Sequence, residues 1–200
     1  MKIAAEETLK LQPTLRSLLD LAWPIALARA TQSVVGFCDA LMVAPLGEAA
    51  LAATTMGALN TFAGIILPVG IVFIVQSFVA QLRGRGDIVA ISRYAWYGLA
   101  LACGAGLVCA ALIPAIPGLI GRLGFASEVQ VLMTGYVTVR VLSIAPAVGV
   151  EALGSWFGGL GNTRPALVGG VATMLANIVG NYLLIEGRGG LPALGVRGAA

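Results

Sequence analysis

Residues 49–82 read AALAATTMGALNTFAGIILPVGIVFIVQSFVAQL, an apolar run without a charged side chain. A helix needs roughly 20 apolar residues to cross a bilayer, so this run predicts a membrane-spanning helix that tilts, kinks or protrudes. Pro68, Val69 and Gly70 interrupt the run and mark the expected break. The sequence therefore indicates that lipid surrounds this part of the chain.

Further apolar stretches on both sides of this run predict five spans in total. The expected spans are residues 15–43, 49–82, 88–113, 128–157 and 166–185, and a sixth begins at residue 195. Residues 1–14 are polar and are expected to precede the first span as a cytoplasmic segment. The run that follows them is too long for a signal-peptide core. Because the sixth span is only begun, we expect a truncated lobe.

Composition agrees with a membrane protein. Hydrophobic residues make up 58% of the chain and charged residues 10%, against roughly a quarter charged in globular domains. Helices satisfy their own backbone groups in lipid, whereas a barrel needs short alternating strands, and this sequence lacks them. The predicted fold class is an all-α polytopic helical bundle.

Residues between the spans carry helix start signals. Asp87 is placed to cap the third span, Ser127 and Glu128 to begin the fourth, and Asn162 or Thr163 to cap the fifth. Pro165 suits a first helical turn.

Several partners and cofactors are not expected. The net charge is +3, but the basic residues are scattered and form no stripe that would bind nucleic acid. Histidine is absent, and the three cysteines lie in apolar sequence without the spacing of metal ligands or a disulfide framework. We expect no metal and no cofactor. Carboxylates and neutral oxygens must then handle any coupled proton or cation.

Basic residues also predict orientation. Seven are expected on the same side of the membrane as the N-terminus: Lys2, Lys10, Arg16, Arg83, Arg85, Arg93 and Arg164. Three lie on the other side: Arg122, Arg188 and Arg197. The positive-inside rule therefore predicts a cytoplasmic N-terminus.

The first span carries polar residues at helical spacing. Arg29, Gln32, Gly36 and Asp39 share one face, and an acid at the depth of Asp39 is costly unless function uses it. Arg29 and Asp39 are about 15 Å apart along a helix, so each needs a partner from another helix. We expect Asp39 to bind a substrate or cation, although a structural hydrogen bond is an alternative. For Arg29 we favour a structural role, in which the cation neutralises a neighbouring charge or extends toward a cavity.

Polar stripes also mark the fourth and fifth spans. In the fifth, Gly170, Thr173, Asn177 and Asn181 share a face. The two amides could ligate a cation, bind a substrate, hydrogen-bond Asp39, or only hold helices together. In the fourth, Arg140, Ser143, Ala147 and Glu151 share a face. Arg140 lies nearer the outer end, and Glu151 is expected to form a salt bridge near the cytoplasmic end.

Segments along nearly the whole chain resemble one family of transporters. They are Ala22 to Ile25, Gly36 to Val43, Leu46 and Gly47, Leu51 to Ala53, Val79 to Gln81, Gly86 and Asp87, Ala145 and Pro146, Gly159 to Pro165, Asn177 and Ile178, Tyr182 to Ile185, Gly190 to Val196, and Gly198 to Ala200. In order and spacing they are similar to those of the multidrug and toxic compound extrusion (MATE) family.

The resemblance implies a twelve-helix exporter with two six-helix lobes in the plasma membrane, or in bacteria the inner membrane. Such exporters expel amphipathic organic cations in exchange for Na⁺ or H⁺, and this chain matches the first lobe. The resemblance makes Asp39 a coupling or substrate residue, together with Asn177 and Asn181. Some proton-coupled members carry an acid where this chain has Asn181, and asparagine there is associated with sodium coupling.

Three other functions are alternatives to an exporter. An enzyme is not expected, because the sequence has no His-Glu-x-x-His, no Gly-x-Ser-x-Gly and no clustered carboxylate motif. A lipid-linked oligosaccharide or polysaccharide flippase of the same superfamily would need a more cationic cavity, for which Arg29 and Arg140 are the support. An inactive half-transporter fragment is the third alternative.

Overall fold

The computed structural model describes residues 15–200, so the predicted N-terminal segment 1–14 lies outside the described part of the chain. Its helices are α2 (Leu15–Val43), α3 (Glu48–Arg85), α4 (Ile88–Ala111), α5 (Ile116–Gly121), α6 (Ser127–Leu142), α7 (Ile144–Gly159) and α8 (Arg164–Leu184). Short 3-10 turns connect or follow them: η1 (Ala44–Leu46), η2 (Ile113–Ala115), η3 (Arg188–Gly190) and η4 (Gly195–Ala199). The all-α prediction is confirmed.

Length and composition identify three membrane spans among the described helices, or four when a bent pair counts as one. They are α3, the run from α4 through α5 (Ile88–Gly121), α8, and the pair α6 and α7. Helix α2 has 29 residues, enough to cross a bilayer, but it does not meet the same hydropathy test. Its Arg29, Gln32 and Asp39 lower the mean hydropathy. That α2 also spans the membrane stays a prediction.

The break expected at Pro68 is not found. Helix α3 runs through Pro68 without interruption for 38 residues, about 57 Å at 1.5 Å per residue. Because the hydrocarbon core of a bilayer is only about 30 Å thick, a helix of this length must tilt or protrude, as the sequence predicts.

The fourth span differs from the single helix predicted over 128–157. The structure divides it at Ser143 into α6 and α7, which are bent by 47° relative to each other. Pro146 lies in the first turn of α7 and has no backbone N–H to donate to the carbonyl of Leu142. The Ser143 hydroxyl donates to the carbonyl of Arg140 at 2.7 Å. These two features end α6 where the bend occurs.

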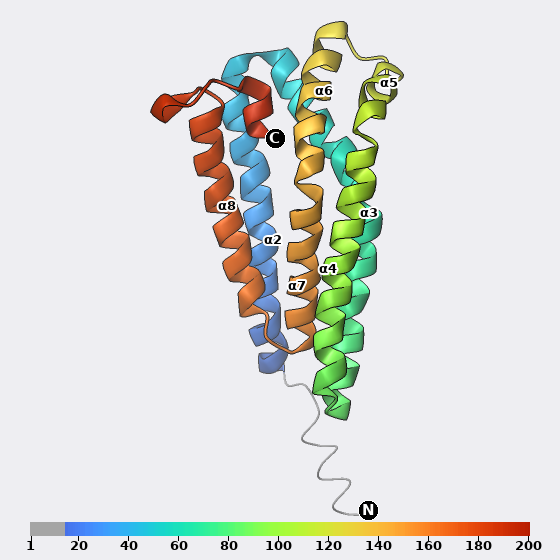
Figure 1. Ribbon diagram of the computed structural model, residues 1–200. Coiled ribbons are helices and arrows are strands. Elements are labelled where there is room, and N and C mark those ends of the chain that lie inside the picture. The colour runs from blue at the N-terminus through green and yellow to red at the C-terminus, as the bar shows by residue number, and fades with distance from the viewer. Residues whose placement is uncertain (1–14) are drawn as a thin grey trace, which may run out of the picture.

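The sixth span expected from residue 195 stays a prediction. Residues Gly195–Ala199 form the 3-10 turn η4, which packs back against α6 and α8. The amide of Leu194 donates to the carbonyl of Leu184 at 2.9 Å, and Val196 and Ala199 are buried. This turn joins α8 to α6 at the end of the bundle opposite Leu15, where α2 begins (Figure 1).

The described helices form two groups. Helix α2 packs mainly on α8, while α7 packs on α3 and α4 and α6 packs on α3 (Figure 1). Glycines permit close approach in the second group. A Cβ atom added at Gly98 would lie 2.9 Å from the Cβ of Ala152, and one added at Gly106 would lie 2.5 Å from the Cβ of Ala145. Small side chains therefore set the distance between α4 and α7.

The predicted helix starts agree in position with the structure. Asp87 caps α4 as predicted, because its Oδ1 accepts from the amide of Ala90 at 2.9 Å. Helix α6 begins at Ser127 with Glu128 in its first turn, as predicted, and Ala126 is its N-cap residue. Thr163 occupies the N-cap position of α8, as one alternative proposed, but its side chain makes no capping hydrogen bond. Pro165 lies in the first turn of α8 as predicted.

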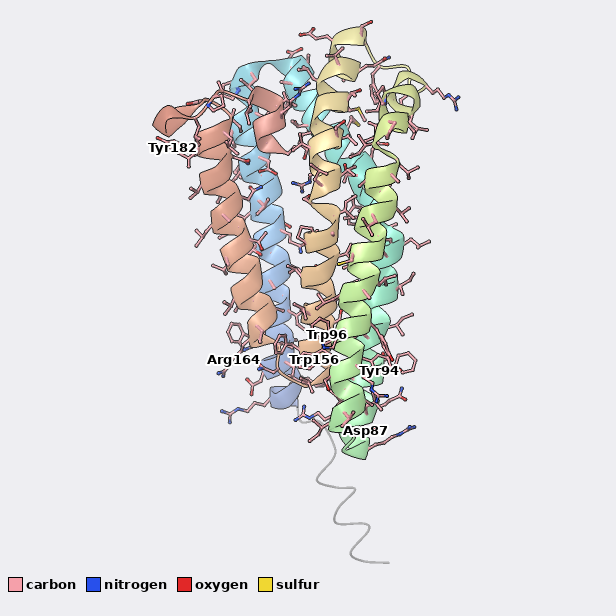
Figure 2. The ribbon with its side chains drawn as sticks, in the orientation of Figure 1. Asp87, Tyr94, Trp96, Trp156, Arg164 and Tyr182 are labelled. Atoms are coloured by element: carbon pink, nitrogen blue, oxygen red, sulfur yellow. The ribbon has the colours of Figure 1, made fainter. Side chains whose placement is uncertain are left out.

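The two ends of the bundle differ in the residues they present. Figure 2 shows Asp87, Trp96, Trp156 and Arg164 at the end nearer the N-terminus and Tyr182 at the opposite end. Trp96 is 73% exposed, as expected of a side chain at a lipid interface. The indole N–H of Trp156 instead donates to the carbonyl of Ile91 at 2.9 Å and joins α7 to α4.

Candidate functional site

The packing of α2 against α8 brings Asp39 and Asn181 together from positions 142 residues apart. The Asn181 side-chain amide donates to Asp39 Oδ1 at 2.5 Å and to Asn177 Oδ1 at 3.4 Å. Asn181 is buried, and Asp39 and Asn177 are half-buried. Close approach of the helices makes this contact possible, because a Cβ added at Gly170 would lie 3.0 Å from Thr31 Oγ1.

Helix α6 supplies the cationic side of this site. Arg140 is close enough to Asp39 for their charges to attract, although no direct ion pair joins them in the described chain. The Arg140 guanidinium donates to the carbonyl of Ala200 at 3.1 Å, which links α6 to the residue after η4. The carboxylate therefore faces one amide donor and a nearby positive charge.

Tyr136 is a site residue that the sequence analysis missed. It is 3% exposed, lies one turn before Arg140 on α6, and is close enough to Asp39 and Arg140 for electrostatic interaction. Gly57 of α3 makes room for its ring, because a Cβ added there would lie 2.6 Å from Tyr136 Cδ1. The spacing of four residues between Tyr136 and Arg140 was the signal that could have identified it.

A second polar cluster joins α2 to α7. Arg29 binds Glu151 through two parallel contacts, Nη1 to Oε1 at 2.8 Å and Nη2 to Oε2 at 2.9 Å. The Gln32 amide donates to the same Oε1 at 3.3 Å. The Arg29 guanidinium carbon also lies 5.5 Å from the centre of the Phe73 ring, within the range of a cation–π contact.

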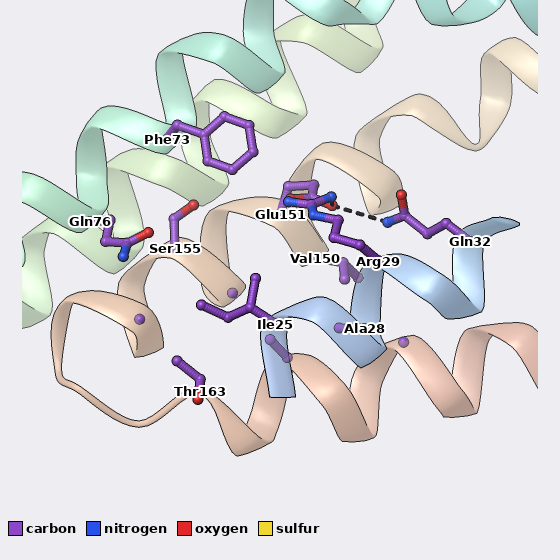
Figure 3. A pocket seen from close by; sticks show the side chains of 14 residues that line it. Ile25, Ala28, Arg29, Gln32, Phe73, Gln76, Val150, Glu151, Ser155 and Thr163 are labelled. Atoms are coloured by element: carbon purple, nitrogen blue, oxygen red, sulfur yellow. Dashed lines mark hydrogen bonds and ion pairs between the residues drawn. The ribbon is translucent and has the colours of Figure 1, made fainter. Parts of the chain in front are cut away.

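A cavity of about 110 Å³ adjoins this cluster. Its walls come from α2, α3, α7 and the start of α8, and Figure 3 shows Arg29, Gln32, Gln76 and Ser155 around it. Glu151 and Phe73 also line it, and Thr163 lines it at the connection between α7 and α8. The cluster and its cavity lie between the two helix groups.

The structure divides the predicted coupling residues. Asp39, Asn177 and Asn181 lie together, and the prediction that the amides hydrogen-bond Asp39 is confirmed for Asn181. Gln32 contacts Glu151 instead of Asp39. Thr173 is exposed, and among the described residues it makes no hydrogen bond to Asp39, Asn177 or Asn181.

The predicted charged residues differ in whether they form an ion pair. Arg29 takes its partner from another helix, as expected, and that partner is Glu151. Arg140 does not pair directly with a carboxylate within the described residues.

The Asp39 site offers a carboxylate and amide oxygens. Hard oxygen ligands suit Na⁺, and a half-buried carboxylate suits a proton. Within residues 15–200 there is no group of three His, Cys, Asp or Glu side chains that could hold a metal ion.

A comparison with protein families gives one decisive match. The family model named MatE matches residues 24–183. This chain belongs to the MatE family. It corresponds to the N-terminal lobe of MATE transporters, and its helices make it a multi-pass membrane protein.

Curated relatives carry names that refer to drug resistance. The chain is 30% identical to the probable multidrug resistance protein NorM of Synechocystis sp., over 95% of this chain and 41% of the relative. It is also 30% identical to the multidrug resistance protein PmpM of Pseudomonas aeruginosa, over 94% of this chain and 39% of the relative. The chain thus spans about two-fifths of the length of the curated relatives it matches.

Solved MATE structures share the fold. A structure described as the outward-facing conformation of a multidrug resistance MATE family transporter matches with a TM-score of 0.82 and 25% identity, over 92% of this chain and 40% of that one. The inward-facing conformation matches with a TM-score of 0.74 and 26% identity, over 84% of this chain and 38% of that one.

Proposed function

We propose that this chain is the substrate- and cation-coupling lobe of a secondary active multidrug exporter. The exporter expels amphipathic organic cations in exchange for Na⁺ or H⁺. The contact between Asp39 and Asn181 carries the proposal, because it holds an acid between two helices of an apolar bundle. An acid at that depth is costly to keep and typically lies on a pathway for ions or substrates.

Asp39 performs the exchange by binding one cation at a time. A coupling ion and a cationic substrate compete for its carboxylate, so binding of one releases the other. Asn181 orients the carboxylate and Asn177 orients Asn181, while Arg140 balances the charge when Asp39 carries no cation. A second lobe packs against this one, and the two rock between inward and outward openings.

The residue at position 181 bears on the choice of coupling ion. Position 181 carries a neutral amide, so the site offers one carboxylate with amide oxygens in place of a pair of carboxylates. This donor set favours Na⁺ over H⁺, because amide oxygens ligate Na⁺ but do not take up a proton near neutral pH.

The flippase alternative loses its main support. Its cationic cavity would require Arg29 and Arg140 to be available to phosphate. Both terminal nitrogens of Arg29 donate to Glu151, and Arg140 is close to Asp39 and donates to the carbonyl of Ala200.

Uptake of ethidium into everted membrane vesicles, which corresponds to export from the cell, tests the proposal. The vesicles come from a pump-deficient bacterial strain that makes this lobe within a two-lobed protein, and an imposed Na⁺ or pH gradient drives transport. We expect Asp39→Asn to abolish gradient-driven ethidium movement and Asn181→Leu to impair it, because the carboxylate then loses its donor. Asp87→Asn is the matched control, since this loop acid lies far along the chain and asparagine can still cap α4.

The same assay separates the alternatives. Unchanged efflux in Asp39→Asn would refute the role of this acid. Ethidium export by vesicles that contain this chain alone would refute the need for a second lobe. A response to the Na⁺ gradient but not to the pH gradient is expected from the neutral residue at 181.

A further inference from the structure

Glu151 presents a binding geometry that suits one chemical class of cation. Its two oxygens accept two parallel N–H donors at 2.8 and 2.9 Å, which is the fork arrangement of a guanidinium on a carboxylate. Gln32 holds Oε1 from the side, and the Phe73 ring lies near the guanidinium carbon. Together these groups recognise a flat cation with two adjacent N–H donors.

The two partners of this ion pair differ in their surroundings. The Glu151 side chain is 20% exposed, whereas the Arg29 side chain is 46% exposed. The arginine therefore has more room to move away from the pair, while the glutamate stays in the wall of the cavity. Since an unpaired carboxylate in a half-buried place is unfavourable, another cation is needed there when Arg29 leaves.

Space for such a cation exists beside the pair. The cavity of about 110 Å³ holds several water molecules, because one water needs roughly 10–15 Å³ by this measure. Gln76 and Ser155 add polar groups to its walls, and Ile25 and Val150 add apolar ones (Figure 3). A ligand with a cationic head and a small apolar body would fit these walls.

We propose that this cavity is a second cation site, which binds an organic cation of the guanidinium or amidinium class at Glu151 in place of the Arg29 side chain. The site is separate from Asp39, which lies farther along α2 and contacts α8 rather than α7. Arg29 acts as an internal competitor for the ligand. The inference concerns equilibrium binding and does not depend on transport.

Competition makes the two charge variants respond in opposite directions. A ligand that binds only when Arg29 has left shows an apparent affinity equal to its intrinsic affinity multiplied by the fraction of time that Arg29 is away. Arg29→Met removes the competitor and should tighten binding by at least about tenfold. Glu151→Gln removes the charge that the ligand pairs with and should abolish binding. A purely structural ion pair would make both variants weaken the fold without improving binding.

Isothermal titration of the purified, detergent-solubilised protein with benzamidinium chloride tests the proposal. Benzamide has the same shape without the charge, and tetramethylammonium has the charge without N–H donors, so neither should bind measurably. Arg164→Met is the matched control for loss of an exposed arginine, and it should leave the dissociation constant unchanged. If Arg29→Met does not fold, Arg29→Gln carries the same test with a polar side chain.

Asp39→Asn separates this site from the proposed transport site. Unchanged benzamidinium affinity in Asp39→Asn, with tighter binding in Arg29→Met and none in Glu151→Gln, supports the proposal. It is overturned if Arg29→Met fails to tighten binding, if tetramethylammonium binds as well as benzamidinium, or if Asp39→Asn abolishes the heat of binding.

Discussion

Asp39 and Glu151 show how one bundle stabilises two acids by different means. Asp39 is held by a neutral amide, whereas Glu151 is held by a guanidinium and a second amide. A neutral partner leaves Asp39 with its charge only partly balanced, by the nearby Arg140. An ionic partner neutralises Glu151 completely. The difference suits the competition of ion and substrate proposed at Asp39 and the replacement of Arg29 by a ligand proposed at Glu151.

The cap of α4 can be tested at a single residue. Asp87→Ala removes the acceptor for the amide of Ala90 and should lower stability by about 1 kcal/mol, while Asp87→Asn should cost much less. Thermal unfolding in detergent, followed by circular dichroism, measures both. Equal losses in the two variants would show that the charge rather than the capping hydrogen bond matters.

At the scale of elements, the contact between α4 and α7 depends on glycine. Gly98 and Gly106 face Ala152 and Ala145 at distances that leave no room for a larger side chain. This packing gives α7 a fixed position, and Glu151 lies on α7 between those two alanines in sequence. Close helix packing in the second group therefore positions the carboxylate of the proposed second site.

A matched pair of glycines tests this contact. Gly106→Leu should destabilise the protein by about 1–3 kcal/mol, because the added side chain must displace α7. Gly104→Leu makes the same chemical change on the same helix where no atom lies within 4 Å of the added Cβ, and it should leave the melting temperature nearly unchanged. Similar melting temperatures for the two variants would contradict the packing argument.

Residues 15–200 form two helix groups, which the turn η1 and a few contacts connect. The Arg29–Glu151 ion pair and the connection between α7 and α8 join them toward the N-terminal end, and η4 joins them at the other. Asp39 lies between these joints, at the surface where α2 meets α8.

Orientation in the membrane is a prediction about the whole molecule. With the N-terminus in the cytoplasm, Gly84→Cys should react with a membrane-impermeant maleimide only in everted vesicles, and Glu48→Cys only in intact cells whose outer membrane has been permeabilised. Both positions are exposed, and replacing Cys38, Cys103 and Cys109 by alanine removes the background. The reverse labelling pattern would overturn the orientation derived from the basic residues.

The sequence alone determined the helical membrane architecture and the family. The length of the apolar runs and the order of the motifs can be read along the chain, and a helix forms its backbone hydrogen bonds within one segment. The sequence also contains a signal for the bend at Ser143, because Pro146 follows three residues later. The bend was not predicted, because the long apolar run favours a single helix. Only the tertiary structure decided which polar residues meet. Asp39 and Asn181 are 142 residues apart, and Arg29 and Glu151 are 122 apart. Helical spacing specifies the face on which a side chain lies, but the partner across the gap depends on how whole helices pack. For that reason Gln32, which shares a face with Asp39, binds Glu151 instead.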